Sequence, residues 1–217
     1  MTWDRTYNNE NKVWGENPSQ LAVFAYNVLT QTNRFQGKKD LFILDLGCGY
    51  GRDSIFLAKN LPCHVLGVDT AAKAIEIGLE ALTPAMRKRV ELLCYDFNDV
   101  NDRYDVILAS NLYQILKPVE RGRLRDTIKR CLNANSLLFL STLSVRDPQH
   151  SGKGTPVEED PNSSIQDKYI HLSTSEELEK AFDFLNISAL FEREYDEPRS
   201  SGAAHHHISW ILMGSMK

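Results

Sequence analysis

The sequence predicts an α/β fold in which a mostly parallel sheet is covered by helices on both faces. Short apolar runs alternate with amphipathic stretches through most of the chain. Because these runs are apolar throughout rather than at every second residue, they are typical of strands that are buried on both sides. The amphipathic stretches between them supply the helical crossovers that parallel strands need. With 217 residues, 42% of them apolar, the chain is long enough to bury one sizeable core.

The elements follow one another in a regular order. Pro18 stands in the first turn of a helix predicted over residues 18–34, where its missing N–H and fixed φ suit the helix. The apolar run at 41–46 predicts the first strand, which ends at a group of glycines. The same patterns predict helices over 52–60, 71–82 and 119–132 and strands over 63–68, 90–95, 104–110 and 136–143.

The last third of the chain departs from this alternation. Residues 145–172 are rich in Asp, Pro, Gly, Ser and His and are too long for an ordinary connection. Their composition does not suggest a packed element, so we expect a lid-like insertion that closes over a ligand. A helix follows over 174–183, and two apolar strands over 186–195 and 206–213 have no helix between them. These two strands should therefore pair as an antiparallel hairpin.

Composition and charge disfavour several classes of protein. The 29 acidic and 25 basic residues leave a net charge of −4, which gives no footprint for nucleic acid. The chain has no apolar run long enough to span a membrane and no secretory signal pattern. Its four cysteines form no Cys-x-x-Cys pair and are typical of free thiols in a reducing compartment. We expect one cytoplasmic domain over 1–217, a monomer or homodimer, with an N-terminal helical segment at 1–36 and the insertion at 145–172.

A glycine-rich loop marks the end of the first predicted strand. It reads Asp45-Leu-Gly47-Cys-Gly49-Tyr-Gly51, and it leads into the next helix. Glycines let the backbone turn sharply and approach a ligand, while the helix N-terminus offers free N–H groups. A dinucleotide fingerprint would need glycine where Arg52 stands, which disfavours nicotinamide and flavin cofactors. The carboxylate of Asp45 suits a ligand that carries an ammonium group.

Two further acidic residues stand at the ends of the next strands. Asp69 ends the second strand region, where a carboxylate can accept hydrogen bonds from ribose hydroxyls. Asp96 and Phe97 follow the third strand, where they can bind the amine and the ring of an adenine. Taken alone, each acid is more typical of a solvated loop residue than of a ligand site. Three acids at three successive strand ends, next to the glycines, favour a ligand site.

Four motifs, DLGCGYG, GVD, CYDF and YDVILASN, resemble those of the class I S-adenosylmethionine-dependent methyltransferases. The resemblance spans roughly residues 40–145 and is nearest to small members of the type 11, type 25 and tellurite-resistance kinds. It implies a Rossmann-like sheet of seven strands in the order 3-2-1-4-5-7-6, with strand 7 antiparallel. It also implies that S-adenosylmethionine is the cofactor.

The resemblance further implies which residues hold the cofactor. Asp69 would hold the ribose, Asp96 and Phe97 the adenine, and the glycine loop the methionine part. Trp14 resembles an aromatic residue that covers the cofactor in these enzymes. The cofactor-binding residues implied in this way are Trp14, Asp45, Gly47, Cys48, Gly49, Gly51, Arg52, Asp53, Asp69, Thr70, Asp96, Phe97, Ser110 and Asn111.

The acceptor site is predicted near the start of the last strand. Strand alternation places His205 and His207 on one face and His206 on the other. Histidine titrates near neutrality, so it suits proton removal from a hydroxyl or thiol acceptor. The candidate catalytic residues are His207, His205, His150 and Tyr113. The competing interpretations are a surface hairpin for the histidines and helix packing for the tyrosine.

No metal is assigned from the sequence. A metal site needs three or four ligands, and two alternating histidines supply only two, so His150 or His171 would have to provide a third.

The predicted reaction is direct methyl transfer to a small-molecule acceptor, in which the protein aligns the acceptor and excludes water. An Asn-Pro-Pro-Tyr motif is absent after Ser110, which disfavours N-methylation of bases or glutamine. The alternatives are a protein or RNA methyltransferase, a non-catalytic cofactor-binding regulator, and a dinucleotide oxidoreductase that Arg52 disfavours.

Overall fold

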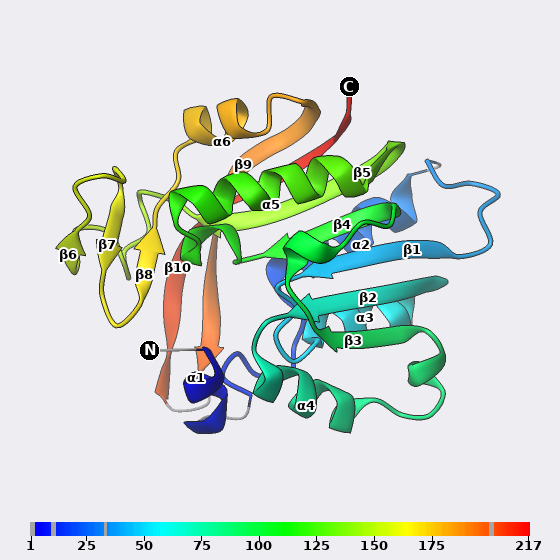
Figure 1. Cartoon of the computed structure of the whole chain (residues 1–217). Coiled ribbons are helices and arrows are strands. Elements are labelled where there is room, and N and C mark those ends of the chain that lie inside the picture. Colours follow the sequence, from blue (N-terminus) through cyan, green and yellow to red (C-terminus); the bar gives the residue numbers. More distant parts are fainter. Residues whose placement is uncertain (1–2, 10–11, 33, 200–201) are drawn as a thin grey trace.

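The computed structural model describes residues 3–9, 12–32, 34–199 and 202–217 (Figure 1). The strands of the main sheet are β1 (Leu41–Leu46), β2 (Cys63–Asp69), β3 (Val90–Cys94), β4 (Tyr104–Ser110), β5 (Leu132–Leu143), β9 (Leu185–Arg199) and β10 (Gly202–Met216). Their order is β3-β2-β1-β4-β5-β10-β9. Strands β1 to β5 are parallel, and β10 pairs antiparallel with both β5 and β9. The predicted strand order and the antiparallel last strand are confirmed.

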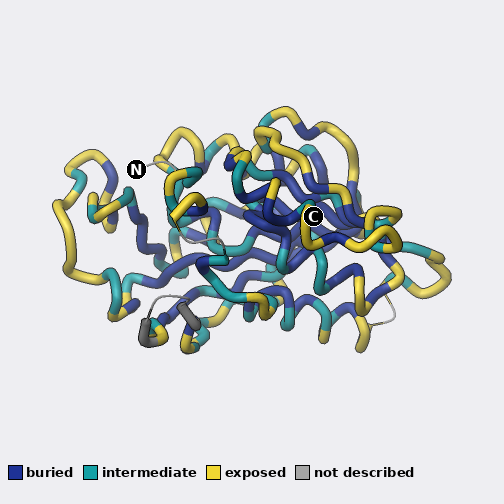
Figure 2. The backbone as a smooth tube through the Cα atoms, turned by 90° about the horizontal axis from the view of Figure 1, so that it is seen from below, coloured by how far each residue is buried: buried dark blue, intermediate teal, exposed yellow. Residues whose placement is uncertain are grey.

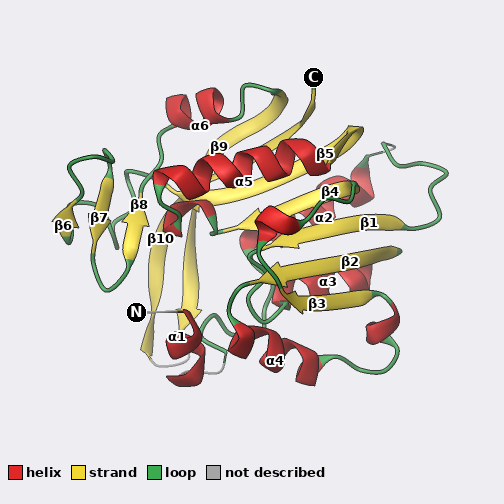
Figure 3. Ribbon diagram, in the orientation of Figure 1, coloured by secondary structure: helices red, strands yellow, loops and turns green. Residues whose placement is uncertain are grey.

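Helices cover both faces of this sheet (Figure 3). They are α1 (Trp3–Asn9), α2 (Gln20–Gln31), α3 (Arg52–Asn60), α4 (Ala72–Ala81), α5 (Pro118–Cys131) and α6 (Ser175–Ala181), with short 3-10 turns at Met86–Lys88, Phe97–Asp99 and Tyr113–Ile115. Helices α2, α3 and α4 pack on the face that carries Ile43. Helices α5 and α6 pack on the face that carries Leu44. Adjacent residues of β1 thus enter opposite cores, which is why its sequence is apolar at nearly every position.

The N-terminal part differs from the prediction in two ways. Helix α1 precedes the predicted first helix, and α2 begins at Gln20 rather than at Pro18. The Ser19 hydroxyl accepts the N–H of Ala22 at 3.1 Å and caps α2, so the proline lies outside the helix. Residues 1–2, 10–11 and 33 of the predicted segment 1–36 lie outside the described residues.

The segment 145–172 is a folded element, so the expectation of an unpacked insertion is wrong. Strands β6 (Thr155–Pro156), β7 (Ser163–Ile165) and β8 (Tyr169–His171) form a small antiparallel sheet beside the start of β10 (Figure 1). We call residues 145–172 the lid. Ile170 and Leu172 of the lid are buried against Leu143 at the end of β5. Such short strands carry no periodic signal of their own, because tertiary contacts hold them.

A buried ion pair fastens the lid to α5. Arg121 donates from its two terminal nitrogens to the two carboxylate oxygens of Asp160, at 2.7 and 3.1 Å. Although burial alone would raise it, hydrogen bonds from Arg121, Ser163 and Tyr169 lower the pKa of Asp160 to about 2. This bidentate geometry is the strong form of a carboxylate–guanidinium contact.

We expect Asp160→Asn to lower the free energy of unfolding by about 2 kcal/mol near pH 7. The folded-state pKa lies below the unfolded one, so this stabilisation is complete above pH 4 and is lost as the pH falls towards 2. Denaturant unfolding of both proteins at pH 7, 4 and 3 measures the difference. Asp126→Asn, at an exposed position of α5, is the control and should change nothing. A pH-independent difference would contradict this account.

The carboxyl ends of the parallel strands, the lid and the β9–β10 hairpin lie at one edge of the molecule. Ser209 of β10 pairs with Leu143, the last residue of β5, so residues 202–208 extend past the end of β5 and pair only with β9. The central strands β1, β4 and β5 form the most buried part of the chain, and the loops around the sheet are more exposed (Figure 2). In the described parts of the chain, no helix has the length and apolarity to cross a membrane.

Candidate active site

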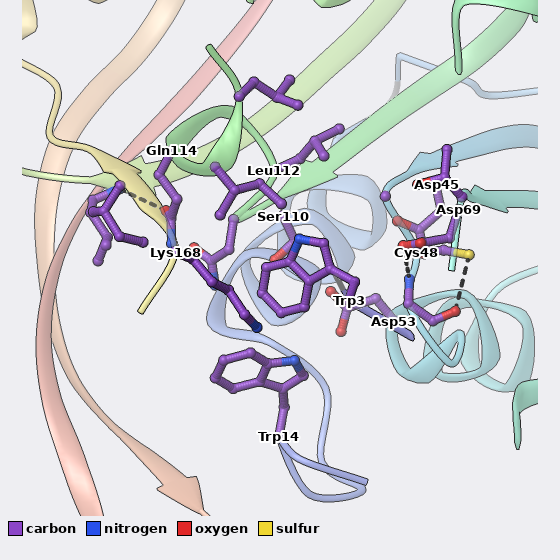
Figure 4. Close-up of a pocket in the computed structure, with 18 of the residues that line it drawn as sticks. Trp3, Trp14, Asp45, Cys48, Asp53, Asp69, Ser110, Leu112, Gln114 and Lys168 are labelled. Atoms are coloured by element: carbon purple, nitrogen blue, oxygen red, sulfur yellow. Dashed lines mark hydrogen bonds between the residues drawn. The ribbon is translucent and has the colours of Figure 1, made fainter. Parts of the chain in front are cut away.

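One cavity of about 740 Å³ lies at this edge of the sheet. It is lined by the glycine loop, the ends of β2 and β4, helix α1, the lid and the start of β10. In Figure 4, Asp45, Cys48 and Asp69 lie on one side of the cavity, Gln114 and Lys168 lie on the other, and Trp3 and Trp14 lie between them. Of the predicted site residues, all line this cavity except Gly51 and Tyr113.

The glycine loop has the backbone conformation that its sequence predicts. Gly47, Gly49 and Gly51 have φ values of 68°, 55° and 72°, in the left-handed region that favours glycine. A Cβ at Gly47 would lie 2.9 Å from a methyl group of Leu112. Gly51 is the residue before α3, so it turns the chain into the helix and lies behind the cavity wall.

Asp69 connects the glycine loop to the start of α4. One carboxylate oxygen accepts the N–H of Gly49 and the other accepts the N–H of Ala71, both at 2.8 Å. Burial raises the pKa of this carboxyl, and the two N–H donors oppose the rise. Each oxygen has a second lone pair, so the group can still accept hydrogen bonds from a ligand in the cavity.

Asp45 is a buried acid next to the same loop. Its carboxylate is 1% exposed and accepts a hydrogen bond from the Ser54 hydroxyl at 2.6 Å. Burial, together with the nearby charge of Asp53, raises the pKa of Asp45 to about 7. A positively charged ligand group beside it would favour the ionised form.

Arg52 and Asp53 hold the chain before α2 against α3. The two oxygens of Asp53 accept the N–H and the hydroxyl of Ser19 at 2.7 and 2.6 Å. Arg52 donates to the Trp14 carbonyl at 2.8 Å and lies 3.4 Å from Glu197 of β9. These contacts position Trp14 at the cavity. They also occupy the carboxylate of Asp53, which the resemblance placed among the cofactor-binding residues.

The segment after β3 forms a further part of the cavity wall. Asp96 accepts hydrogen bonds from the backbone and the side chain of Asn98 at 2.9 and 2.7 Å, which starts the 3-10 turn at Phe97–Asp99. Phe97 is half-buried beside it, and both residues line the cavity.

Helix α1 adds aromatic residues that the sequence analysis missed. Trp3 and Tyr7 line the cavity, and the Tyr7 ring packs edge-on against Tyr50 at 6.0 Å. The Lys168 ammonium of the lid lies 3.4 Å from the centre of the Trp3 ring and 2.7 Å from the Thr6 hydroxyl. The lid and α1 therefore meet across the cavity mouth. The spacing of Trp3 and Tyr7, one helical turn apart, was the available signal.

The structure places two of the predicted strand histidines at the other end of the cavity. His205 and His207 line the cavity, whereas His206 points outward to Asp196 at 3.0 Å. His207 is 3% exposed, and its ring stacks on that of His150 with centroids 5.8 Å apart. The lid thus brings His150 to the strand histidines.

Asp147 is the main acidic residue that the sequence analysis missed. Its carboxylate lies 2.9 Å from Nδ1 of His207 and accepts backbone N–H bonds from Gln149, His150 and Ile208. Burial would raise the pKa of Asp147, but the bonds from His207 and Ile208 outweigh it and lower the pKa. Nothing in the sequence around this loop acid marks it as special.

Tyr113 and His171 lie away from this group. The Tyr113 hydroxyl donates to Glu177 of α6 at 3.0 Å, and its ring is 3% exposed in the core. The catalytic assignment of Tyr113 is therefore not supported, and the helix-packing alternative describes its position. His171 lies 2.9 Å from the same glutamate and 2.8 Å from Ser163, so His150 rather than His171 joins the strand histidines.

The chain was compared with known proteins at the levels of sequence and fold. Residues 43–135 match a family model described as a methyltransferase domain. An uncharacterised protein of Rickettsia prowazekii is 30% identical over 103 residues, which are 46% of this chain and 41% of that protein. The match thus spans less than half of this relative's length.

Solved structures share the fold over most of the chain. A S-adenosylmethionine-dependent methyltransferase of Methanosarcina mazei has a TM-score of 0.68 at 19% identity, and the match covers 83% of this chain and 95% of that one. A 1,6-didemethyltoxoflavin-N1-methyltransferase of Burkholderia thailandensis, with bound 1,6-didemethyltoxoflavin and S-adenosylhomocysteine, has a TM-score of 0.65 at 15% identity over 98% and 84%. Residues 43–135 therefore resemble a methyltransferase domain, and the chain as a whole shares the fold of these solved methyltransferases.

Proposed function

We propose that this protein transfers a methyl group from S-adenosylmethionine to a small-molecule acceptor. The observation that carries the proposal is one cavity with two chemically different ends. Asp45, Asp69 and the glycine loop line one end, and His150 and His207 line the other. A cofactor and an acceptor in the two ends would meet between them.

The cofactor end offers a partner for each part of S-adenosylmethionine. Asp69 would accept hydrogen bonds from the ribose hydroxyls, and Asp45 would lie near the ammonium group. Asp96 and Phe97 would bind the amine and the face of the adenine. The Trp14 carbonyl accepts a hydrogen bond from Arg52, and in this position Trp14 would cover the methionine part.

The acceptor end favours a small molecule. The lid and α1 meet over it through Lys168 and Trp3, which restricts access for a folded macromolecule. The side chains that line this end include His205 of β10, Tyr195 and Glu197 of β9, and Gln166 of the lid. We assign His207, His205 and His150 to binding and activating the acceptor. Closure of the lid on the occupied cavity would exclude water.

The reaction is an in-line displacement at the methyl carbon. A lone pair of the acceptor attacks the carbon, the bond from carbon to the sulfonium sulfur breaks, and the electron pair stays on sulfur. Because the sulfonium already activates the methyl group, the protein contributes mainly by alignment. The free thiols of the described cysteines support our proposal that the protein acts in the cytoplasm. It would act there as a monomer or homodimer.

Calorimetry followed by an acceptor screen tests this function. S-adenosylmethionine and S-adenosylhomocysteine should bind with one site per chain, and NAD should not bind. Methyl-labelled cofactor is then offered with pools of small hydroxyl, thiol and amine compounds, and in parallel with RNA and protein extracts. Transfer to RNA or protein but to no small molecule would replace the small-molecule proposal. Binding of NAD alone would remove the methyltransferase proposal.

Binding of the cofactor should release protons near pH 7. Burial and the nearby charge of Asp53 raise the pKa of Asp45 in the free protein, so the group holds a proton at a higher pH than an ordinary carboxyl does. The cofactor ammonium would lower that pKa and drive the proton off. Calorimetry in two buffers of different ionisation enthalpy measures this release, which should fall towards zero at pH 9. Asp45→Asn should abolish the release, and a release that persists in this variant would assign it to another group.

A further inference from the structure

We propose that Asp147, His150 and His207 bind one divalent transition-metal ion at the acceptor end of the cavity. One possible ligand atom from each of the three residues lies within 4.8 Å of the other two. Two imidazoles and a carboxylate are the protein ligands of several catalytic zinc centres and of related ions. The site differs from the one considered in the sequence analysis, because Asp147 rather than His205 joins His207 and His150.

The fold brings these three residues together at the end of the sheet. The chain leaves β5 at Leu143 and turns back across the start of β10, where the Ser144 N–H donates to the Ile208 carbonyl at 2.9 Å. The Ile208 N–H donates in turn to Asp147 at 2.9 Å. The turn from Asp147 to His150 then places the carboxylate and the imidazole beside His207.

The separations within the cluster suit ligands of a single ion. Oδ2 of Asp147 lies 2.9 Å from Nδ1 of His207. Two neighbouring ligands at about 2.1 Å from an octahedral ion are about 3 Å apart, and tetrahedral ligands are slightly further apart. The His150 ring is nearly parallel to that of His207, at an angle of 10°. The three ligand atoms lie within 4.8 Å of one another, so coordination of one ion would turn these side chains towards a common point.

Residues around the cluster orient its ligands. The Gln166 side-chain oxygen lies 2.9 Å from Nδ1 of His150, and this contact favours the tautomer that leaves Nε2 as the lone-pair donor. Two backbone N–H groups hold the other oxygen of Asp147, both at 3.0 Å. Glu197 lies 3.9 Å from Nε2 of His207 and adds negative charge next to the site. Metal-binding residues are commonly oriented by such outer contacts.

A hydrogen-bonded pair of Asp147 and His207 explains only part of this arrangement. It accounts for the 2.9 Å contact between them, but not for a second imidazole stacked on His207. Gln166 holds His150 at both its ring nitrogen and its carbonyl oxygen, at 2.9 and 3.3 Å. A metal ion accounts for all three residues, because each supplies one ligand.

The chemical role of the ion rests on the proposed function. Three protein ligands leave open positions on an ion of this kind, and His150 and His207 both line the cavity. A hydroxyl or thiol acceptor at an open position would lose its proton to solvent more easily. The lone pair left on oxygen or sulfur would then attack the methyl carbon, and S-adenosylhomocysteine would leave as the neutral thioether.

Metal binding is tested on the full chain, independently of methyl transfer. Protein stripped with a chelator is titrated with Zn²⁺ by calorimetry and with Co²⁺ by visible absorption. We expect one ion per chain in wild type. Asp147→Asn, His150→Ala and His207→Ala should each weaken binding at least tenfold. His206→Ala is the matched control and should bind as wild type does, because His206 is a neighbouring histidine on the outward face.

Two outcomes overturn the proposed metal site. Wild type that binds neither ion has no such site, and equal weakening by His206→Ala would mean adventitious binding to the histidine run. Because Asp147→Asn also removes a structural contact, thermal melting checks its fold, and His150→Ala provides a second, less buried ligand variant. Cofactor calorimetry on the stripped protein separates the two proposals. Cofactor binding without metal binding removes only the metal site, and the reverse removes only the methyltransferase function.

Discussion

Replacing His207 with alanine should lower methyl transfer about a hundredfold and leave cofactor affinity unchanged. His207 lies at the acceptor end, and the cofactor contacts proposed above involve Asp45, Asp69 and Asp96. An activating group of this kind typically contributes a hundredfold or more to the rate. The imidazole is 3% exposed and held by Asp147, so its position at the cavity wall is fixed. The measurement is the single-turnover rate with labelled cofactor and an acceptor found in the screen.

His206→Ala is the matched control for this variant. It removes the adjacent histidine of the same strand, whose side chain points to Asp196 on the outer face. Its transfer rate should equal that of wild type. The two variants should also bind S-adenosylhomocysteine equally. A His207→Ala protein with the wild-type rate across pH 5 to 9 would return the histidines to the surface-hairpin interpretation.

The Asp69→Ala variant should bind S-adenosylmethionine at least tenfold more weakly than wild type. Two hydrogen bonds from ribose hydroxyls to a carboxylate contribute about 1.5–3 kcal/mol each, and tenfold corresponds to about 1.4 kcal/mol. The substitution also removes the acceptor for the N–H groups of Gly49 and Ala71, so the glycine loop loses part of its support. Both effects act in the same direction. Calorimetry of the folded variant gives the affinity directly.

A second variant separates contact with the ligand from support of the loop. Asp69→Asn keeps one oxygen for a backbone N–H and loses the charge, so its affinity should lie between those of wild type and the alanine variant. Asp126→Ala, at an exposed position of α5, controls for a general loss of acidic charge and should bind as wild type does. Wild-type affinity in a folded Asp69→Ala protein would refute the ribose-binding role.

The sheet was predictable because its signals are local. The run at β1 is apolar at nearly every position, and the glycines after it need the positive φ that they show. Helix α1 has only a weak signal, the one-turn spacing of Trp3 and Tyr7, and it buries only Tyr7. The lid strands are two or three residues long. The ion pair between Arg121 and Asp160 joins the lid to α5. A contact between residues so distant in sequence leaves no periodic pattern.

The candidate site was predictable to the extent that it depends on strand ends and alternation. Asp45 and Asp69 stand where strands end, and alternation separated His206 from its neighbours. Asp147 was missed because its importance comes from the crossing of the lid over β10. Tyr113 was assigned wrongly because the chain after β4 turns its ring into the core, where Glu177 of α6 binds the hydroxyl.

The two ends of the cavity come from different parts of the chain, and this has an evolutionary consequence. The family match covers residues 43–135, which include the glycine loop, Asp69 and Asp96. The lid and the β9–β10 hairpin, which build the histidine end of the cavity, lie outside that range, and so does α1. Relatives that share only the matched range can therefore inherit the same cofactor chemistry and still diverge in the compound they modify. Exchange of the lid and hairpin between such relatives, with residues 43–135 left intact, is the route by which a new acceptor specificity would arise.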